Sequence, residues 1–347
     1  MKIKALITSA LAAFLLLPTT AAFSSLKNSL VVVKASDSDI PATADGSDWA
    51  VAILDSGIDS SHPFFKDASG NSRVIAEACF ASRCPNGKSS SFGVGQAAHR
   101  GGSWHGTHVA GIAAGNSHGA SNSSPRGVAK NAKIVAVNVF ETSGVVFGMN
   151  IDAGLKWILE QKKSGVKIAS VNMSVSSTIV HPGACDNTTP STKKIIDELN
   201  AEGVVVVAAT GNNSSRAGMT WPACLSNVIP VGSVDYNLTV ASVSNVSRGL
   251  ASTGLVAPGV SVCSSMTYDR ARTGYGCASG TSVATPHVVG AVALLRQAAP
   301  NASYAQIVTA LRTTRTAIND RRLGGTVVGV PLLDVSAALN SLKTANN

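Results

Sequence analysis

Hydrophobic and polar positions follow two alternating patterns from residue 49 onward. Nearly continuous apolar runs, mostly β-branched and typical of strands covered on both faces, lie at residues 51–54, 133–140, 166–173, 204–209 and 228–234. Helical spacing of apolar residues is found at residues 105–114, 149–163, 192–202, 282–298 and 303–314. This alternation predicts an α/β fold, a doubly wound and mostly parallel sheet with helices on both faces.

The segments between these elements contain no linker rich enough in Pro, Gly or Ser to divide the chain, and no internal repeat. Residues 71–102 are predicted to be a long irregular loop, and residues 115–127 a polar one. We therefore expect one domain over residues 23–347. In an open parallel sheet the ligand crevice lies at the carboxyl ends of the strands, so candidate chemistry is sought there.

The first 22 residues have the layout of a cleavable secretory signal. Two lysines occur within residues 1–4, residues 5–17 are uncharged and mostly apolar, and residues 18–22 end in small residues. The alternative is a membrane anchor, but Pro18 ends the apolar stretch before the ~20 residues that a spanning helix needs. The prediction is cleavage near Ala22, an extracellular protein, and no stable membrane association afterwards.

Six cysteines in an exported chain are able to pair in an oxidising environment. The spacing suggests Cys79 with Cys84, Cys263 with Cys277 and, as the remaining pair, Cys185 with Cys224. Four residues within the first pair permit a tight loop, and the second pair would brace the segment ahead of residue 282. Free buried thiols are the alternative.

A formal charge of +9 and a pI near 9.4 would suit an acidic partner. Lys and Arg are nevertheless scattered, with no run longer than two. The basic balance is therefore interpreted as a contribution to solubility, and no nucleic-acid partner is predicted.

Two polar residues stand at the starts or ends of predicted elements in the first half of the chain. Asp55 follows the apolar run VAIL and precedes Ser56 and Gly57, which places its carboxylate at a strand tip; a turn or helix-cap aspartate is the alternative. His105 opens the segment HGTHVAGIAAG, whose small residues let a helix pack closely on a sheet. His105 and His108 at i, i+3 also resemble metal ligands, but no nearby carboxylate completes such a set.

Two more polar residues stand at such positions in the second half. Ser282 lies where a glycine-bearing turn leads into a long apolar helix, and the positive helix end favours negative charge there. Pro286 is expected in the first turn, where amides lack intrahelical acceptors. A plain capping serine is the alternative. Asn212 follows the run VVVVAATG and is otherwise a turn former.

Asp, His and Ser in this order supply the parts of a nucleophilic site. A serine hydroxyl is a poor nucleophile until a neutral histidine removes its proton, and a carboxylate fixes the tautomer of that histidine. We predict Asp55 as orienting carboxylate, His105 as base and Ser282 as nucleophile. The amide of Asn212 is predicted to donate to the oxyanion that forms when Ser282 attacks a carbonyl.

Five segments then resemble the subtilisin-like serine proteases in sequence and order. They are DSGID (55–59), HGTHVAG (105–111), NMS (172–174), ATGN (209–212) and GTSVATPHVVG (280–290), spread over residues 49–314. The resemblance implies a subtilisin-like fold and a secreted serine endopeptidase that acts on proteins or peptides, as a monomer and without a required cofactor. It also implies two substrate-binding segments, an edge of Ser174, Val175 and Ser176 and a pocket wall of Ala209, Thr210 and Gly211.

Three features depart from the family pattern. Val175, Ser176 and Ser177 stand where many relatives have a hydrophobic residue and two glycines, and Thr220 stands where relatives often carry glycine, which predicts a preference for small or medium side chains. Only 32 residues separate Ala22 from Asp55, so no N-terminal pro-domain is expected. Residues 116–126, near the usual calcium loop, contain no Asp or Glu, so a tight calcium site there is not expected. Structural calcium at other sites stays open, and no metal ligand is assigned.

Three other functions are alternatives. A transpeptidase or ligase would use the same triad with an amine in place of water, and the sequence does not separate it from a hydrolase. A non-catalytic binding protein is disfavoured because all four catalytic positions are intact. An α/β-hydrolase esterase is disfavoured because the nucleophile of that family precedes the other two triad residues, whereas Ser282 follows them in this chain.

Overall fold

In the part of the chain that the structure describes, the central sheet has eight strands in the order β12-β11-β9-β7-β2-β5-β3-β4. The computed structural model describes residues 5–6, 19–98, 103–118, 125–269, 272–314, 316–322 and 327–345. The strands of this sheet are β2 (Ala50–Asp55), β3 (Val74–Phe80), β4 (Ser90–Phe92), β5 (Lys133–Asn138), β7 (Ile168–Met173), β9 (Val205–Ala209), β11 (Ile229–Val234) and β12 (Leu255–Pro258). Every neighbouring pair is parallel except β3 with β4.

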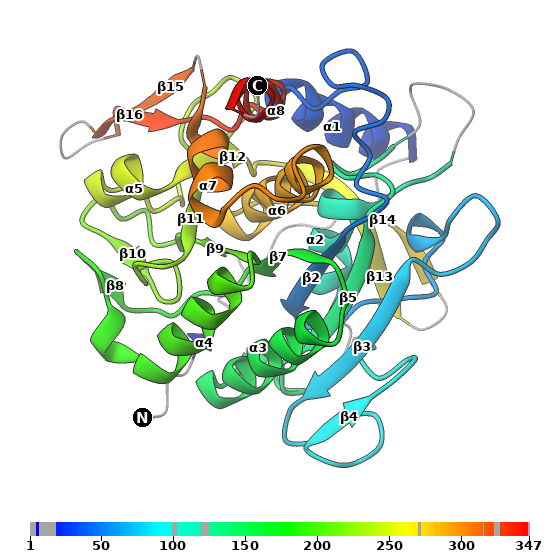
Figure 1. Cartoon of the computed structure of the whole chain (residues 1–347). Coiled ribbons are helices and arrows are strands. Elements are labelled where there is room, and N and C mark those ends of the chain that lie inside the picture. The colour runs from blue at the N-terminus through cyan, green and yellow to red at the C-terminus, as the bar shows by residue number, and fades with distance from the viewer. Residues whose placement is uncertain are drawn as a thin grey trace.

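The strand order reverses at β2, and this reversal decides where a ligand is bound. β2 pairs with β5 on one side and with β7 on the other. The chain adds β3 and β5 on the first side and then β7, β9, β11 and β12 on the second. In open α/β sheets the crevice lies at the carboxyl ends of strands at such a switch point. The carboxyl ends of β2, β7 and β9 are therefore brought to one region (Figure 1).

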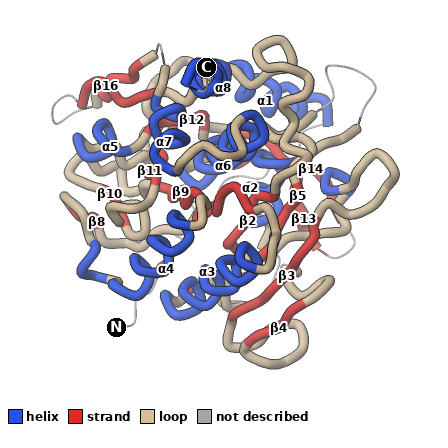
Figure 2. The backbone as a smooth tube through the Cα atoms, viewed as in Figure 1, coloured by secondary structure: helices blue, strands red, loops and turns tan. Residues whose placement is uncertain are grey.

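Helices cover both faces of this sheet, as Figure 2 shows with helices in blue and strands in red. They are α1 (Thr19–Val32), α2 (His105–Ala114), α3 (Gly148–Lys163), α4 (Pro190–Ala201), α5 (Arg248–Thr253), α6 (Thr281–Ala298), α7 (Tyr304–Arg312) and α8 (Val335–Ala345). The side chains of Val51 and Ile53 in β2 join the buried cluster that contains α1, α2, α6, α7 and α8. Those of Ala52 and Leu54 join the cluster with α3 and α4 on the other face. The predicted two-sided, mainly parallel sheet is thus confirmed.

Shorter elements lie around this sheet. Two-stranded antiparallel pairs join β1 (Ala5–Leu6) with β6 (Val145–Val146), β8 (Val180–His181) with β10 (Met219–Thr220), β13 (Val262–Asp269) with β14 (Arg272–Ala278), and β15 (Ala317–Asp320) with β16 (Val327–Pro331). Single turns of 3-10 helix cover Pro63–Phe65 and Asp186–Thr188.

All five predicted strands and all five predicted helices are present, with ends shifted by at most two residues. The expected irregular loop at residues 71–102 is wrong in part, because β3 and β4 lie within it. β3 was missed because its apolar run is interrupted by Glu77, whose carboxylate is buried and accepts the amide of Ala97 at 3.1 Å. A partnered polar residue breaks the apolar pattern without breaking the strand.

The predicted signal segment, residues 1–22, falls mostly outside the described residues, and α1 begins within it at Thr19. None of the helices that the structure describes has the length and apolar character of a membrane span. Beyond the predicted cleavage point, Leu26, Leu30 and Val33 are buried in the main core. The carbonyl of Val33 accepts the amide of Val335 at 2.9 Å, which ties this segment to α8.

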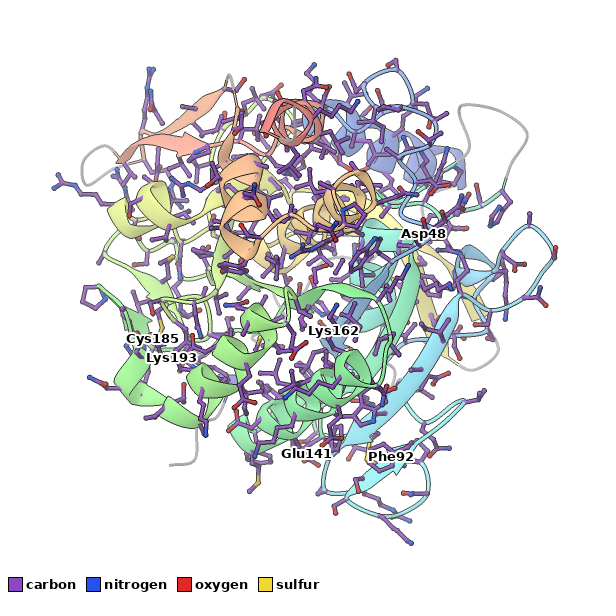
Figure 3. The ribbon with its side chains drawn as sticks, viewed as in Figure 1. Asp48, Phe92, Glu141, Lys162, Cys185 and Lys193 are labelled. Atoms are coloured by element: carbon purple, nitrogen blue, oxygen red, sulfur yellow. A yellow bond between two sulfur atoms is a disulfide. The ribbon has the colours of Figure 1, made fainter. Side chains whose placement is uncertain are left out.

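All three predicted disulfides are formed, and no cysteine is left free. Cys263–Cys277 joins β13 to β14 at a directly opposed pair of positions, which braces the hairpin that precedes α6. Cys185–Cys224 closes a sequence separation of 39 residues on the side of the molecule that carries α4, where Cys185 and Lys193 are labelled in Figure 3. Of the three disulfides it closes the longest loop, and a longer loop removes more conformations from the unfolded chain.

Candidate active site

Asp55 is the last residue of β2, and its side chain is fully buried. Its Oδ1 accepts two hydrogen bonds, from the amide of Ser56 at 2.7 Å and from the ring Nδ1 of His105 at 2.8 Å. A buried carboxylate is tolerated when such donors compensate the water it has lost. The bond to Nδ1 also sets the tautomer of His105, because it places the ring proton on Nδ1 and leaves Nε2 free to accept a proton.

His105 is the first residue of α2, which lies against the end of β2. The hydroxyl oxygen of Ser56 accepts the amide of Gly106 at 3.1 Å and so satisfies a donor of the first helical turn. A Cβ at Gly106 would lie 2.2 Å from the carbonyl oxygen of Gly57. Only glycine therefore lets the helix approach β2 closely enough for His105 to meet Asp55.

The environment of His105 acts on its pKa in two opposing ways. Burial disfavours the charged ring, whereas the adjacent Asp55 carboxylate favours it by charge and by its hydrogen bond. The carboxylate outweighs the burial, so the pKa of His105 lies above its ordinary value. His105 is thereby a stronger base than an isolated imidazole, while its side chain keeps 16% exposure to the pocket.

Ser282 is the second residue of α6, at the positive end of the helix dipole. The chain turns into this helix at Gly280, whose φ of +145° is a conformation that other residues rarely adopt. The sequence pattern predicts Pro286 in the first turn, but this residue lies inside the helix. The helix begins one residue earlier than predicted, at Thr281, so Pro286 removes an interior hydrogen bond to the residue four positions before it.

Asn212 follows the carboxyl end of β9 by three residues and is held by the first residue of α6. Its Oδ1 accepts the amide of Thr281 at 2.9 Å and the Thr281 hydroxyl at 3.0 Å. With Oδ1 occupied twice, the Nδ2 donor is turned away from Thr281. It lies 3.1 Å from the position of a Cβ built on Gly280, beside the start of the helix that carries Ser282.

One pocket brings the predicted residues of the second half together with His105. His105, Asn212 and Ser282 all line it, and Asp55 lies directly behind His105. The remaining lining residues are mostly small and polar: Ser174, Ser176, Ser177, Thr178, Ala209, Asn213 and Thr281. A carbonyl compound that enters this pocket would meet a hydroxyl, an imidazole and an amide donor.

Three of the six predicted substrate-binding residues line the pocket, and the other three make packing or hydrogen-bond contacts within the protein. Ser174, Ser176 and Ala209 line the pocket. Val175 packs into a hydrophobic cluster with 2% exposure, and the Thr210 hydroxyl donates to the carbonyl of Asn245 at 2.8 Å. The Gly211 amide donates to the Thr281 hydroxyl at 3.2 Å.

Four pocket residues were not predicted from the sequence: Ser177, Thr178, Asn213 and Thr281. Each is adjacent in sequence to an assigned residue or segment, so extending those segments by one or two positions would have found them. The side chain of Thr220 is fully buried, and its Oγ1 lies 2.6 Å from the position of a Cβ built on Gly211.

Two further histidines are buried behind the site and do not form a metal centre with His105. His108 donates from Nε2 to the carbonyl of Gly276 at 3.1 Å, while His105 faces Asp55. His287 in α6 contacts the hydroxyl of Ser29 through Nε2 at 2.9 Å. Burial lowers the pKa of His108 to about 3 and that of His287 to about 4. Both rings are therefore neutral in the folded protein at neutral pH.

These depressed pKa values predict a loss of stability in mild acid. The unfolded chain binds protons at histidine below about pH 6.5, whereas the folded chain does not bind them at His108 or His287 until pH falls much further. The contribution of these two rings to stability is thus fully present above pH 6.5 and falls as pH is lowered toward 4, by about 1.4 kcal/mol per pH unit for each ring. Urea unfolding between pH 7 and 5, above the range of most carboxylates, measures this slope.

The control for this acid effect is His287→Gln, which keeps a donor toward Ser29 and does not titrate. It is expected to reduce the dependence of the unfolding free energy on pH. An unchanged slope in the variant would show that His287 is not the origin of the effect.

Asn116 lies two residues after α2, in the segment where the sequence predicts no tight calcium site. Asn116 uses both side-chain groups within the protein, since its Oδ1 accepts the amide of His118 and its Nδ2 donates to Asn131. In the described part of the chain no three His, Cys, Asp or Glu residues gather into a metal-binding group. Residues 119–124 of the predicted polar loop lie outside the described residues.

Comparisons with known proteins point to one family. A sequence profile of the Subtilase family matches residues 46–328. Alkaline protease from Alkalihalobacillus alcalophilus and Subtilisin Savinase from Lederbergia lenta are each 35% identical over 282 residues, or 81% of this chain. The chain spans 62% of the former protein and 88% of the latter. A solved structure described among proteases from Pseudoalteromonas arctica has a TM-score of 0.67 and 26% identity, over 91% of this chain and 93% of that one.

Proposed function

This chain belongs to the Subtilase family, and from that premise we propose that it is a secreted serine endopeptidase that hydrolyses peptide bonds in proteins. Catalysis is proposed to proceed by nucleophilic attack of a serine and a covalent acyl-enzyme. The observation that carries the proposal is the single pocket in which His105, Asn212 and Ser282 meet, with Asp55 bonded behind His105.

Acylation uses all four residues. Nε2 of His105 takes the proton of the Ser282 hydroxyl as its oxygen attacks the substrate carbonyl. The oxyanion that forms accepts hydrogen bonds from Nδ2 of Asn212 and from the amide of Ser282, which belongs to the first turn of α6 and has no intrahelical acceptor. Asp55 stabilises the imidazolium. His105 then gives its proton to the leaving amine, and the peptide bond breaks.

Deacylation repeats these steps with water. His105 removes a proton from the water that attacks the ester carbonyl, and the same two donors receive the oxyanion. Return of the proton to Ser282 releases the carboxylic acid product and regenerates the free enzyme. The reaction needs no cofactor, because each proton and each developing charge has a protein group to receive it.

Substrate recognition is proposed to involve Ser174, Val175 and Ser176 as a main-chain edge and Ala209, Thr210 and Gly211 as the facing wall. Strand addition of this kind reads the shape of an extended peptide more than its sequence. The bulk of Thr220 next to Gly211 supports a preference for small or medium side chains. The catalytic unit is proposed to begin near residue 23, since Leu26, Leu30 and Val33 are part of its core.

Export is supported by the N-terminal pattern and by three disulfides, which persist in oxidising compartments.

The test of the proposed function uses the purified wild-type protein. A fluorophosphonate probe is expected to label one residue, and peptide mass mapping is expected to place the label on Ser282. A denatured protein substrate is expected to yield internal cleavage products. Labelling elsewhere, or no cleavage of any denatured protein, would refute the proposal.

Asn212→Ala is expected to lower kcat by about 10²–10³-fold, a magnitude taken from the equivalent donor of subtilisin. KM is expected to change little, because the hydrogen bond from Nδ2 forms with the oxyanion and not with the ground-state carbonyl. Steady-state kinetics on a peptide substrate separate the two constants. A rise in KM with unchanged kcat would assign Asn212 to substrate binding instead.

A further inference from the structure

A hydrogen bond links the edge of the pocket to the main chain of Ser282. The hydroxyl of Ser174 donates to the carbonyl oxygen of Ser282 at 2.7 Å, across 108 residues of sequence. Ser174 directly follows β7, and its side chain is buried with 3% exposure. The bond therefore joins the carboxyl end of a central strand to the first turn of α6.

Pro286 explains why this carbonyl needs a partner from outside the helix. In an α-helix the carbonyl of residue 282 would accept the amide of residue 286, but proline has no N–H. Proline also pushes against the carbonyl four residues before it. The Ser282 carbonyl thus lacks its helical donor, and the hydroxyl of Ser174 takes that place.

Asn172 orients the Ser174 hydroxyl that donates to the carbonyl of Ser282. Its Nδ2 donates to Oγ of Ser174 at 3.0 Å, and its side chain is fully buried within β7. A second contact, from Ser174 Oγ to Oδ1 of Asn172, is longer at 3.2 Å. The single hydroxyl proton of Ser174 is therefore directed along the shorter contact, toward the Ser282 carbonyl.

We propose that Ser174 is a positioning residue for the nucleophile. Through the carbonyl that Pro286 leaves without a helical donor, it fixes the main chain of Ser282, and with it the direction of the attacking hydroxyl and of the amide that faces the oxyanion. This inference rests on the proposed function. It gives the Ser174 side chain a role that is separate from the main-chain contact with substrate proposed above.

Ser174→Ala tests the proposal. Small misplacements of reacting groups cost up to about a hundredfold, so kcat is expected to fall between about tenfold and a hundredfold. The rate of phosphonylation by a small fluorophosphonate is expected to fall by the same factor, since this reaction needs the nucleophile and no extended substrate. A change confined to KM would overturn the proposal, because it would assign the hydroxyl to substrate binding.

Ser170→Ala is the matched control. Ser170 lies on the same strand and donates to the carbonyl of Val289 in the same helix at 2.9 Å. That carbonyl has its helical donor, the amide of residue 293, and lies about two turns beyond Ser282. Ser170→Ala is expected to lower thermal stability and to change kcat by less than about threefold, as distant sites act independently. An equal loss of kcat in Ser174→Ala and Ser170→Ala would show that Ser174 supports only the stability of the fold, and would overturn the proposal.

Pro286→Ala supplies the decisive comparison, because it restores an amide donor to the Ser282 carbonyl. In this background Ser174→Ala is expected to lower kcat by less than about threefold, since the helix now satisfies the carbonyl. The same loss as in the native background would overturn the proposal. If Ser174→Ala alone does not fold, kcat of Pro286→Ala is compared with kcat of the double variant. A loss of less than about threefold between them supports the proposal, and a larger loss would overturn it. Absent labelling of the wild type would instead refute the proposed function.

Discussion

Ser282→Ala is expected to lower kcat by about six orders of magnitude, the magnitude known from subtilisin, and to abolish labelling by a fluorophosphonate. Alanine removes the attacking oxygen, so no acyl-enzyme forms, whereas the position at the start of α6 and the contacts of Thr281 with Asn212 stay intact. Residual hydrolysis above the uncatalysed rate would then come from the oxyanion donors and from substrate binding. Peptide hydrolysis over long incubations and probe labelling measure the two effects.

Ser279→Ala is the control for this variant. Ser279 is an exposed serine three residues earlier, and its hydroxyl accepts the amide of Ser261 at 2.9 Å. The variant is expected to retain both labelling and hydrolysis. Persistent labelling of Ser282→Ala would show that another residue is the nucleophile.

Asp55→Asn is expected to lower kcat by about four orders of magnitude at neutral pH, as is known for serine-protease triads in general. The amide of asparagine would donate to Nδ1 of His105 and so force the ring proton onto Nε2, where it blocks acceptance of the serine proton. The variant also removes the negative charge that stabilises the imidazolium. Single-turnover rates of acylation measure the loss directly.

The pH dependence of the rate is a second test of the contact between Asp55 and His105. His105 acts as a base only when neutral, so the wild-type rate falls as pH drops through the pKa of His105, which Asp55 raises above its ordinary value. In Asp55→Asn the raising influence is gone while burial still lowers the pKa, so the residual activity is expected to persist to lower pH. A midpoint that does not move would contradict the assignment of Asp55.

Asp59→Asn is the matched control for this charge. Asp59 lies four residues after Asp55 and bonds to the hydroxyls of Thr267 and Ser61 rather than to His105. Activity near that of the wild type is expected, together with an unchanged pH profile. A loss comparable to that of Asp55→Asn would indicate that the whole segment, and not the carboxylate at β2, sustains activity.

Local patterns in the sequence predicted the elements that carry the site. β2, β5, β7, β9 and β11 consist mostly of buried apolar residues, and such runs indicate burial on both faces. Elements with mixed polarity were missed. β13 buries Ser264, Ser265 and Thr267, which are polar and so mask the strand pattern. β12 is apolar throughout and was missed for a different reason, because it has only four residues. Partnered polar residues inside a fold cannot be told from exposed ones by periodicity.

The sequence by itself determined which residue types stand at the ends of the strands and the starts of the helices, because hydrophobic periodicity and turn residues act over a few positions. Only the tertiary structure decided which of them meet. The contact between His105 and Asp55 spans 50 residues, and the one between Ser174 and Ser282 spans 108. Such contacts depend on strand order and helix packing, which no local pattern encodes.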